Sequence, residues 1–190
     1  MNATRKRAIT LVVGCLKSSA VVAALGAFGL SASVAAQDAP APRLTLAFTL
    51  KVMVGPPQEQ GTVDGKRMRF VPITGGTIEG PRLHGVVLAG GGDWQALHAD
   101  GLTEVNTRYA LRSDDGTVID IVNPGVRVAS PDVSARLARG ELVDPTSYYF
   151  RTTPRFTVPD GRYAWLRRAV FVGYGIRRPS EVEIRVFTVE

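Results

Sequence analysis

Cysteine is almost absent from this sequence. Its 190 residues include a single cysteine, Cys15, which lies in an N-terminal stretch with the features of an export leader. The rest of the chain can therefore form no disulfide and offers no thiol nucleophile, and an oxidising compartment would leave it unchanged. Val12-Val13-Gly14-Cys15 has part of the pattern of a bacterial lipoprotein box. Lys17 follows at once, so we favour an incidental cysteine over a lipid anchor.

Histidine and long apolar runs are also scarce. His84 and His98 are the two histidines, and they form neither an HxH nor an HExxH motif, so we predict no metal and no cofactor. A metal site made of His98, Asp93 and Asp100 is the less favoured alternative. No apolar run reaches the roughly 18–20 residues that a spanning helix needs, which predicts no membrane span.

The formal net charge of +6 does not indicate a nucleic-acid-binding protein. Arg5-Lys6-Arg7 and Lys17 lie in the leader, which holds no acidic residue. Removing these four from the 23 basic residues leaves 19 basic against 17 acidic residues. This near balance argues against nucleic acid and anionic membrane surfaces as partners. The basic clusters Lys66 to Arg69 and Arg177-Arg178 flank turns, and we expect them to be solvated loop ends.

The N-terminal stretch predicts export. A basic segment precedes an apolar run from Val21 to Leu30, and Val34-Ala35-Ala36 fits a small-residue cleavage site. We therefore predict a signal peptide over residues 1–36 with cleavage after Ala36, an Ala/Pro linker over 37–42 and one domain over 43–190. The protein is expected to be periplasmic or secreted.

Alternation of apolar and polar residues predicts that the domain is built from strands. From Leu44 to Val54 every second residue is apolar, a period of two that is typical of a strand with one buried face. Glu104 to Arg112 alternates again, and Ser113-Asp114-Asp115-Gly116 predicts a hairpin turn. Further strands are predicted over residues 68–73, continuing over 77–79 after a bulge, and over 82–88, 94–97, 117–122, 148–158, 163–176 and 181–189.

One helix interrupts this pattern. Ser130 is a good N-cap, Pro131 suits the first helical position, and Gly140 is typical of a helix end. Many short strands with a single helix predict an all-β fold: a closed or nearly closed antiparallel β-barrel of about 8–9 strands with one short surface helix. We expect the first and last strands to pair across the closure.

The chain resembles an uncharacterised bacterial and fungal family called domain of unknown function 3237, or UPF0311. The resemblance is carried in order along nearly the whole predicted domain by Phe48-Thr49-Leu50, Pro72 to Gly76, Gly80 to Leu88, Asp93-Trp94-Gln95, Asp100-Gly101, Tyr109-Ala110-Leu111, Asp114-Asp115-Gly116, Tyr149 to Thr152, Pro154-Arg155-Phe156 and Tyr163 to Leu166. It implies a compact β-barrel and little about activity. The family pattern usually has Pro-Gly-Gly-Ala where this chain has Ala89-Gly90-Gly91-Gly92, Thr157 and Arg167 also depart from it, and a leader is not general in the family. If those positions line a pocket, the ligand or activity differs from that of other members.

The stretch Gly90-Gly91-Gly92-Asp93-Trp94-Gln95 is the leading candidate site. Three glycines suit a place where backbone passes close to something while polar side chains point at it. Asp93 is predicted to be a general acid or base, and Arg151, which lies between aromatic residues, to bind a carboxylate or balance Asp93. The alternatives are that Asp93 caps its own turn and that Arg151 points outward.

Four aromatic residues are predicted to bind a ligand: Trp94, Tyr109, Tyr149 and Trp165. A plain core role is the alternative for Trp94, and the favoured one for Tyr109 and Trp165. The predicted function is binding of a small organic molecule at the barrel mouth. A cofactor-independent isomerase, cyclase or hydrolase that uses Asp93 is the first alternative, with Tyr109 or Arg151 stabilising negative charge. A structural module that forms a homodimer through an exposed sheet face is the second.

Overall fold

The computed structural model describes residues 40–190. The predicted leader, its cleavage site and Cys15 lie outside these residues. The strands are β1 Leu44–Val54, β2 Gln58–Val63, β3 Lys66–Glu79, β4 Gly85–Val87, β5 Gly92–Leu97, β6 Leu102–Ser113, β7 Val118–Val128, β8 Tyr149–Thr152, β9 Arg155–Thr157, β10 Phe171–Arg177 and β11 Glu181–Val189. The helices are α1 Pro131–Ala138 and the short 3-10 helices η1 Pro145–Ser147 and η2 Ala164–Arg167. Over the described range no helix is both long enough and apolar enough to cross a membrane.

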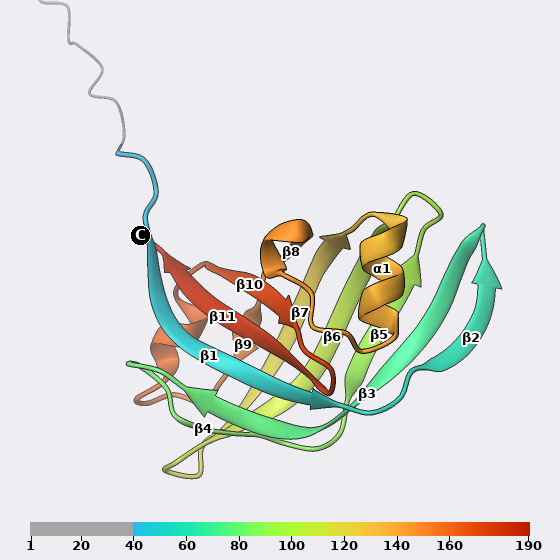
Figure 1. Ribbon diagram of the computed structural model, residues 1–190. Helices are drawn as coiled ribbons and strands as arrows, with labels where there is room; N and C mark the ends of the chain where they lie inside the picture. The colour runs from blue at the N-terminus through green and yellow to red at the C-terminus, as the bar shows by residue number, and fades with distance from the viewer. Residues whose placement is uncertain (1–39) are drawn as a thin grey trace, which may run out of the picture. The chain divides into compact units, whose positions relative to one another are not determined.

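Eight strands form a closed antiparallel barrel, as the sequence predicts (Figure 1). Their order is β6-β5-β3-β1-β11-β10-β8-β7, and β7 pairs back with β6 along residues 102–112. The first and last strands pair from Leu44 with Val189 to Met53 with Glu181, so the predicted closure partners are confirmed.

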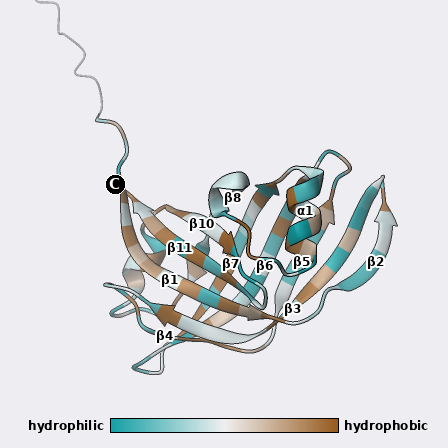
Figure 2. Ribbon diagram, viewed as in Figure 1, coloured by the Kyte–Doolittle hydropathy of each residue, from teal (hydrophilic) through white to brown (hydrophobic). Residues whose placement is uncertain are grey.

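Three further strands extend the barrel wall. β4 pairs with both β3 and β6, and β9 pairs with β7. β2 forms a hairpin with β3 that the alternation pattern did not reveal, because all of its residues are exposed; Figure 2 colours it mostly teal to white. Its sequence signal is Asp64-Gly65, whose φ angles of 49° and 76° are those of a tight hairpin turn.

The buried face of β1 changes along its length. The sequence predicts one apolar face from Leu44 to Val54, but the pairing with β11 shifts register between Leu46 and Phe48. Leu44 and Leu46 are therefore exposed, whereas Phe48 is fully buried. A bulge of this kind moves the residues on one side of it to the other face of the sheet.

Three predicted strand limits are wrong for identifiable reasons. β7 does not end at Asn123-Pro124-Gly125 but runs on to Val128. Pro124 is tolerated because its outer partner changes there: β9 pairs with β7 up to Val122, and β8 pairs with it from Gly125. Pro154 likewise separates β8 from β9, and the predicted long strand over 163–176 is η2 followed by β10.

One end of the barrel is filled by aromatic side chains. Phe48, Phe156, Trp165 and Phe171 pack edge-on or tilted, with ring centroids 5.1 to 6.4 Å apart. Leu166 on η2 is also buried there, within the same apolar core. This end is solid core, and the hydropathy bands that alternate along β1 and β3 in Figure 2 reflect the inward and outward faces that build it.

The glycine run 90–92 passes close to the neighbouring strand β6. Gly90 N donates to Ile73 O at 3.0 Å, and Ile73 N donates to Gly91 O at 3.3 Å, so β3 holds the run from one side. Gly91 has a φ of 71°, and a Cβ there would overlap the carbonyl oxygen of Arg108 on β6. The run thus brings β5 against β6 at the residue where Asp93 enters the barrel wall.

We expect Gly91→Ala to destabilise the protein by about 1–3 kcal/mol more than Gly90→Ala. Both residues have positive φ angles, but a Cβ at Gly90 would meet no atom within 4 Å. The backbone strain is no smaller at Gly90, whose φ is 112° against 71° at Gly91, so a greater loss of stability at Gly91 reports the clash. Urea unfolding of both variants measures the difference, and equal stabilities would contradict the close approach.

Candidate functional site

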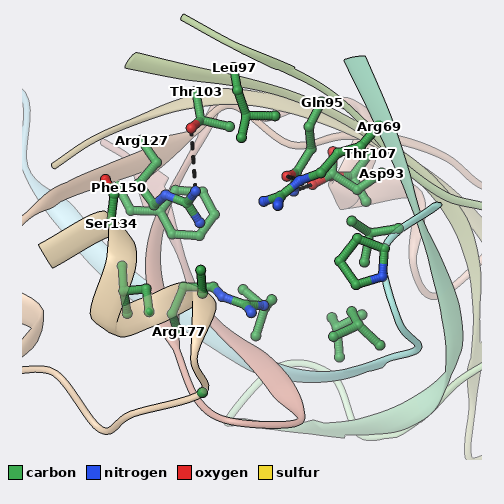
Figure 3. Close-up of a pocket in the computed structure, with 18 of the residues that line it drawn as sticks. Arg69, Asp93, Gln95, Leu97, Thr103, Thr107, Arg127, Ser134, Phe150 and Arg177 are labelled. Atoms are coloured by element: carbon green, nitrogen blue, oxygen red, sulfur yellow. Dashed lines mark hydrogen bonds between the residues drawn. The ribbon is translucent and has the colours of Figure 1, made fainter. Parts of the chain in front are cut away.

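The end of the barrel opposite the aromatic core encloses a cavity of about 620 Å³. Figure 3 shows its interior, with side chains converging from several strands and from α1. Apolar, neutral polar and charged side chains line it, among them Arg67, Arg69, Ile73, Asp93, Gln95, Leu97, His98, Thr103, Tyr109, Asn123, Arg127, Ser134, Phe150, Thr152, Arg177 and Ile184. The barrel interior is therefore solid at one end and hollow at the other.

Strand periodicity places the polar side chains in the cavity. Asp93, Gln95 and Leu97 alternate along β5, and Arg69 lies opposite Gln95 on β3. Adjacent strand residues point to opposite faces, so every second residue of these strands faces inward. The extension of β7 beyond Pro124 adds Arg127 to the same face as Asn123.

Three arginines surround the hollow without a carboxylate partner. In Figure 3 the guanidinium groups of Arg69, Arg127 and Arg177 point from three sides toward the open centre. Arg127 is 8% exposed, and its Nη2 donates to Thr103 Oγ1 at 3.3 Å. Within residues 40–190 none of the three has an acidic oxygen within 4.0 Å.

Burial and mutual repulsion weaken the protonation of these arginines without removing it. Burial, followed by the charges of Arg177 and Arg69, lowers the pKa of Arg127 to about 10. Burial also lowers the pKa of Arg69 and of Arg177. Arg127 with a pKa near 10 stays protonated at neutral pH. A guanidinium is protonated in proteins in general, so Arg69 and Arg177 are treated as cations too.

Asp93 is tied to Arg69 through Gln95. Arg69 Nε donates to Gln95 Oε1 at 2.7 Å, and Gln95 Nε2 donates to Asp93 Oδ2. Because a guanidinium can only donate, the orientation of the Gln95 amide is fixed. Asp93 Oδ1 accepts from the backbone N–H of Asn106 at 3.0 Å. Burial raises the pKa of Asp93 although these hydrogen bonds oppose the rise.

The inner part of the cavity carries three buried polar atoms without a hydrogen-bond partner in the described chain: Tyr109 Oη, Asn123 Oδ1 and Thr152 Oγ1. They come from β6, β7 and β8. Buried polar atoms are normally hydrogen-bonded, and exceptions call for an explanation. A bound molecule would provide partners for all three.

The predicted site residues do not converge. Asp93 and Tyr109 line the cavity. Arg151 lies outside it, with its guanidinium 3.8 Å from the Tyr174 ring centroid and 5.0 Å from that of Tyr149. Tyr149 is 51% exposed. The alternation of β8 explains this, because Phe150 and Thr152 take the inward positions.

The two tryptophans also lie away from the cavity. Trp94 follows Asp93 directly, so it points outward; it is 45% exposed and packs on Phe70 with ring centroids 4.9 Å apart. Trp165 belongs to the filled end, where the Arg82 guanidinium lies 3.6 Å from its ring centroid. His98 lines the cavity, and its Nε2 lies 2.7 Å from Glu104 Oε1.

Comparison with known proteins identifies the family. The sequence profile of the family described as "Protein of unknown function (DUF3237)" matches residues 42–189. The chain belongs to this family. A UPF0311 protein of Rhodopseudomonas palustris is 35% identical over 142 residues, which are 75% of this chain and 93% of that protein.

Solved structures agree with the barrel. The crystal structure of the Rhodopseudomonas palustris protein superposes with a TM-score of 0.77, covering 80% of this chain and 100% of that one. A β-barrel-like protein of Acinetobacter baumannii gives a TM-score of 0.70 at 37% identity, covering 80% and 99%. The structure of an enzyme from Penicillium herquei gives 0.61 at 20% identity, covering 81% and 99%, and shows the fold alone.

The departures of this DUF3237 member from the family pattern do not lie in the cavity. The departing residues are absent from the cavity lining: Ala89, Gly92, Thr157 and Arg167. Ala89 and Thr157 are exposed, and Arg167 pairs with Asp160 at the filled end. These differences therefore do not change the cavity wall.

The arginines of the cavity were missed by the sequence analysis. Lys66 to Arg69 and Arg177-Arg178 were expected to be solvated loop ends, but Arg69 and Arg177 line the cavity. The signal for Arg69 was its alternation with Val71 and Ile73 in a predicted strand. Arg127 carries no such signal, because Asn123-Pro124-Gly125 predicts a strand end before it.

We expect Asp93→Asn to gain stability relative to the native protein as the pH rises above about 4. A folded pKa raised above the unfolded value means that the native state binds more protons, so native stability falls as the pH rises through the folded pKa. The substitution removes this loss of stability, which is at most about 1.4 kcal/mol per pH unit. Urea unfolding of both proteins from pH 3 to pH 8 measures the difference. This range starts about one unit below the pKa of an unfolded aspartate and ends well above it.

Asp115→Asn is the matched control with the opposite sign. Hydrogen bonds from Ser113 and Thr117 lower the pKa of Asp115 to about 2. The native protein is therefore favoured over this variant by a constant amount above about pH 4, and the advantage is lost as the pH falls toward 2. Parallel pH profiles for Asp93→Asn and the native protein would contradict the raised pKa.

Proposed function

We propose that this DUF3237 protein binds a small organic molecule in the hollow half of its barrel. The observation that carries the proposal is a set of three buried polar atoms, on Tyr109, Asn123 and Thr152, that find no hydrogen-bond partner within residues 40–190 and that line a cavity of about 620 Å³. Ligand sites are typically clefts of roughly 300–1,000 Å³ with a few convergent polar groups in a mainly apolar wall. The filled aromatic end holds the barrel together, so the hollow half is not needed as core.

The cavity wall combines both surfaces that such a ligand needs. Ile73, Leu97, Phe150 and Ile184 supply apolar contacts, and Gln95, Thr103 and the arginines supply hydrogen bonds. Helix α1 lies beside the hollow and contributes Ser134 to its lining (Figure 3). A ligand would therefore be enclosed by strands on most sides and by α1 at the mouth.

Export is part of the same proposal. Its support is the basic, apolar and small-residue pattern of residues 1–36, which predicts a periplasmic or secreted protein. A ligand for such a protein would be a compound that reaches the cell envelope or the medium.

We expect a blocked cavity to abolish ligand-induced stabilisation. A ligand present at 100 times its Kd stabilises the native state by about 2.7 kcal/mol, and each kcal/mol raises Tm by roughly 2–4 °C in a domain of this size. Thermal-shift screening with Ser134→Trp should lose the shift of any compound that binds the native protein, because the indole fills the mouth. Arg139→Trp, on the exposed face of the turn that ends α1, is the control. Hits that persist in Ser134→Trp would bind elsewhere and count against the proposal.

Catalysis in the same cavity is the second candidate function. The observation that favours it is Asp93, a carboxyl group with a raised pKa beside guanidinium groups. A raised pKa makes such a carboxyl a better proton acceptor than an ordinary aspartate, and nearby cations stabilise the negative charge that develops on a substrate. Arg127 and Arg177 line the cavity with Asp93, so they can take the charge-stabilising role predicted for Arg151. The barrel of the Penicillium herquei protein belongs to an enzyme, so this architecture is compatible with catalysis.

We expect Asp93→Asn to lower kcat by about 10²–10⁴ for any bound compound that the native protein converts, since Asn cannot transfer the proton. Binding of that compound should persist, because Asn retains the size of the side chain. Product formation measured by mass spectrometry, together with a thermal shift for binding, separates the two effects. Unchanged turnover would rule out Asp93 as the acid or base.

A further inference from the structure

We propose that the ligand of the barrel is an amphipathic organic acid: an apolar body whose oxyanion group is held by Arg127 and Arg177, with Arg69 completing the anion site. This inference rests on the proposed function, because it assigns the chemical class of the molecule that the cavity binds.

The charge balance of the cavity wall favours an anion. Its lining holds four arginines, at positions 67, 69, 127 and 177, and one carboxylate, Asp93. Arg67 points to the hairpin, where its Nε lies 3.5 Å from Glu59. Three arginines then face Asp93, and the wall is positive whether Asp93 is ionised or neutral. His98 is next to Glu104 and supplies no negative charge to the wall.

The hydrogen bonds of the arginines leave room for an anion. Within the described part of the chain, Arg127 has one side-chain partner, a threonine hydroxyl, and the Arg177 guanidinium has none. Arg69 uses Nε for Gln95, which leaves both of its Nη groups directed at the hollow. A buried cation without a counter-ion is unfavourable, and a planar guanidinium matches an oxyanion through paired hydrogen bonds. A bound acid would supply the missing partner.

The depth of the cavity defines the rest of the molecule. Asn123 and Arg127 lie four residues apart on β7, which is roughly 13 Å along the strand. Tyr109 pairs with Ile121, which pairs with Phe156 of the aromatic end, so Tyr109 and Asn123 lie deeper than Arg127. Phe150 lies opposite Arg127 across β7 and β8, so apolar wall and arginine are at the same level. The ligand therefore carries its acid beside an apolar body near the mouth and a neutral polar group deeper in the cavity.

An inorganic anion does not satisfy this arrangement. Phosphate or sulfate would neutralise the arginines, but it would leave the inner polar atoms without partners and the apolar wall in contact with water. An organic acid and an inorganic anion both carry an oxyanion group. The apolar body of the organic acid distinguishes the two, and the cavity is long enough to hold it.

A pair of matched fluorescent probes tests the inference. Anilinonaphthalene sulfonate and N-phenylnaphthylamine have the same aromatic skeleton, and only the first carries an oxyanion group. We expect the native protein at neutral pH to bind the sulfonate at least about tenfold more tightly than the neutral probe, because charge-assisted hydrogen bonds favour it. Arg127→Met and Arg177→Met should each weaken the sulfonate about tenfold and leave the neutral probe unchanged.

Two controls keep the result interpretable. Arg151→Met removes an arginine that is stacked on Tyr174 outside the cavity, and it should leave both probes unchanged. Arg127→Lys replaces Arg127→Met if the latter does not fold. It keeps the charge but loses the planar fork, so it should retain part of the preference for the sulfonate. Thermal unfolding of each variant establishes that it is folded.

The outcomes separate this inference from the proposed function. Suppose that both probes bind with equal affinity, that Ser134→Trp excludes both, and that Arg127→Met changes the affinity of neither. The cavity then binds small molecules, but the assignment of an acid is wrong. If Ser134→Trp affects neither probe, the proposed function itself fails. Competition completes the test: decanoate should displace the sulfonate at about tenfold lower concentration than decanol, and inorganic phosphate should not displace it. Displacement by inorganic phosphate alone would overturn the requirement for an apolar body.

Discussion

The pairing of β6 with β7 is the constraint on which the rest of the molecule depends. It closes an otherwise open sheet along residues 102–112, and closure gives every barrel strand one inward face and one outward face. The inward face of β6 then carries Tyr109, and that of β7 carries Asn123 and Arg127. Without this ladder these three side chains would lie on an exposed sheet surface.

Closure also divides the interior into two parts with different roles. At one end Phe48, Phe156, Trp165 and Phe171 fill the space and supply the apolar burial that stabilises a domain of this size. At the other end three arginines and Asp93 are partly or largely removed from water, which opposes folding. Natural proteins commonly accept such a cost where a site needs it. The aromatic end provides the stability that makes a charged hollow tolerable.

The fold class followed from the sequence because period-two alternation and turn residues are local signals. The pairing of the first and last strands could also be predicted, since both are clean amphipathic strands. The site could be predicted only in part. Asp93 and Tyr109 were recognised, but alternation does not say which of its two faces is inside, so Arg151 was placed on the inner face of β8. Asp93 and Trp94 were placed in one site although adjacent strand residues must diverge. Arg127 was missed because Pro124 reads as a turn unless the exchange of partners beside it is known.

The rim of the hollow is made largely of chain connections. Pro56, Ala99, Gly101 and Ser180 contribute to the lining, and each lies between two strands. A surface connection accepts inserted residues without altering the hydrogen-bond ladder on either side of it. Members of a family built on this barrel can therefore lengthen or shorten the rim while the register and the aromatic end stay the same. Chemical diversity can thus evolve at the entrance of this barrel without endangering its folding.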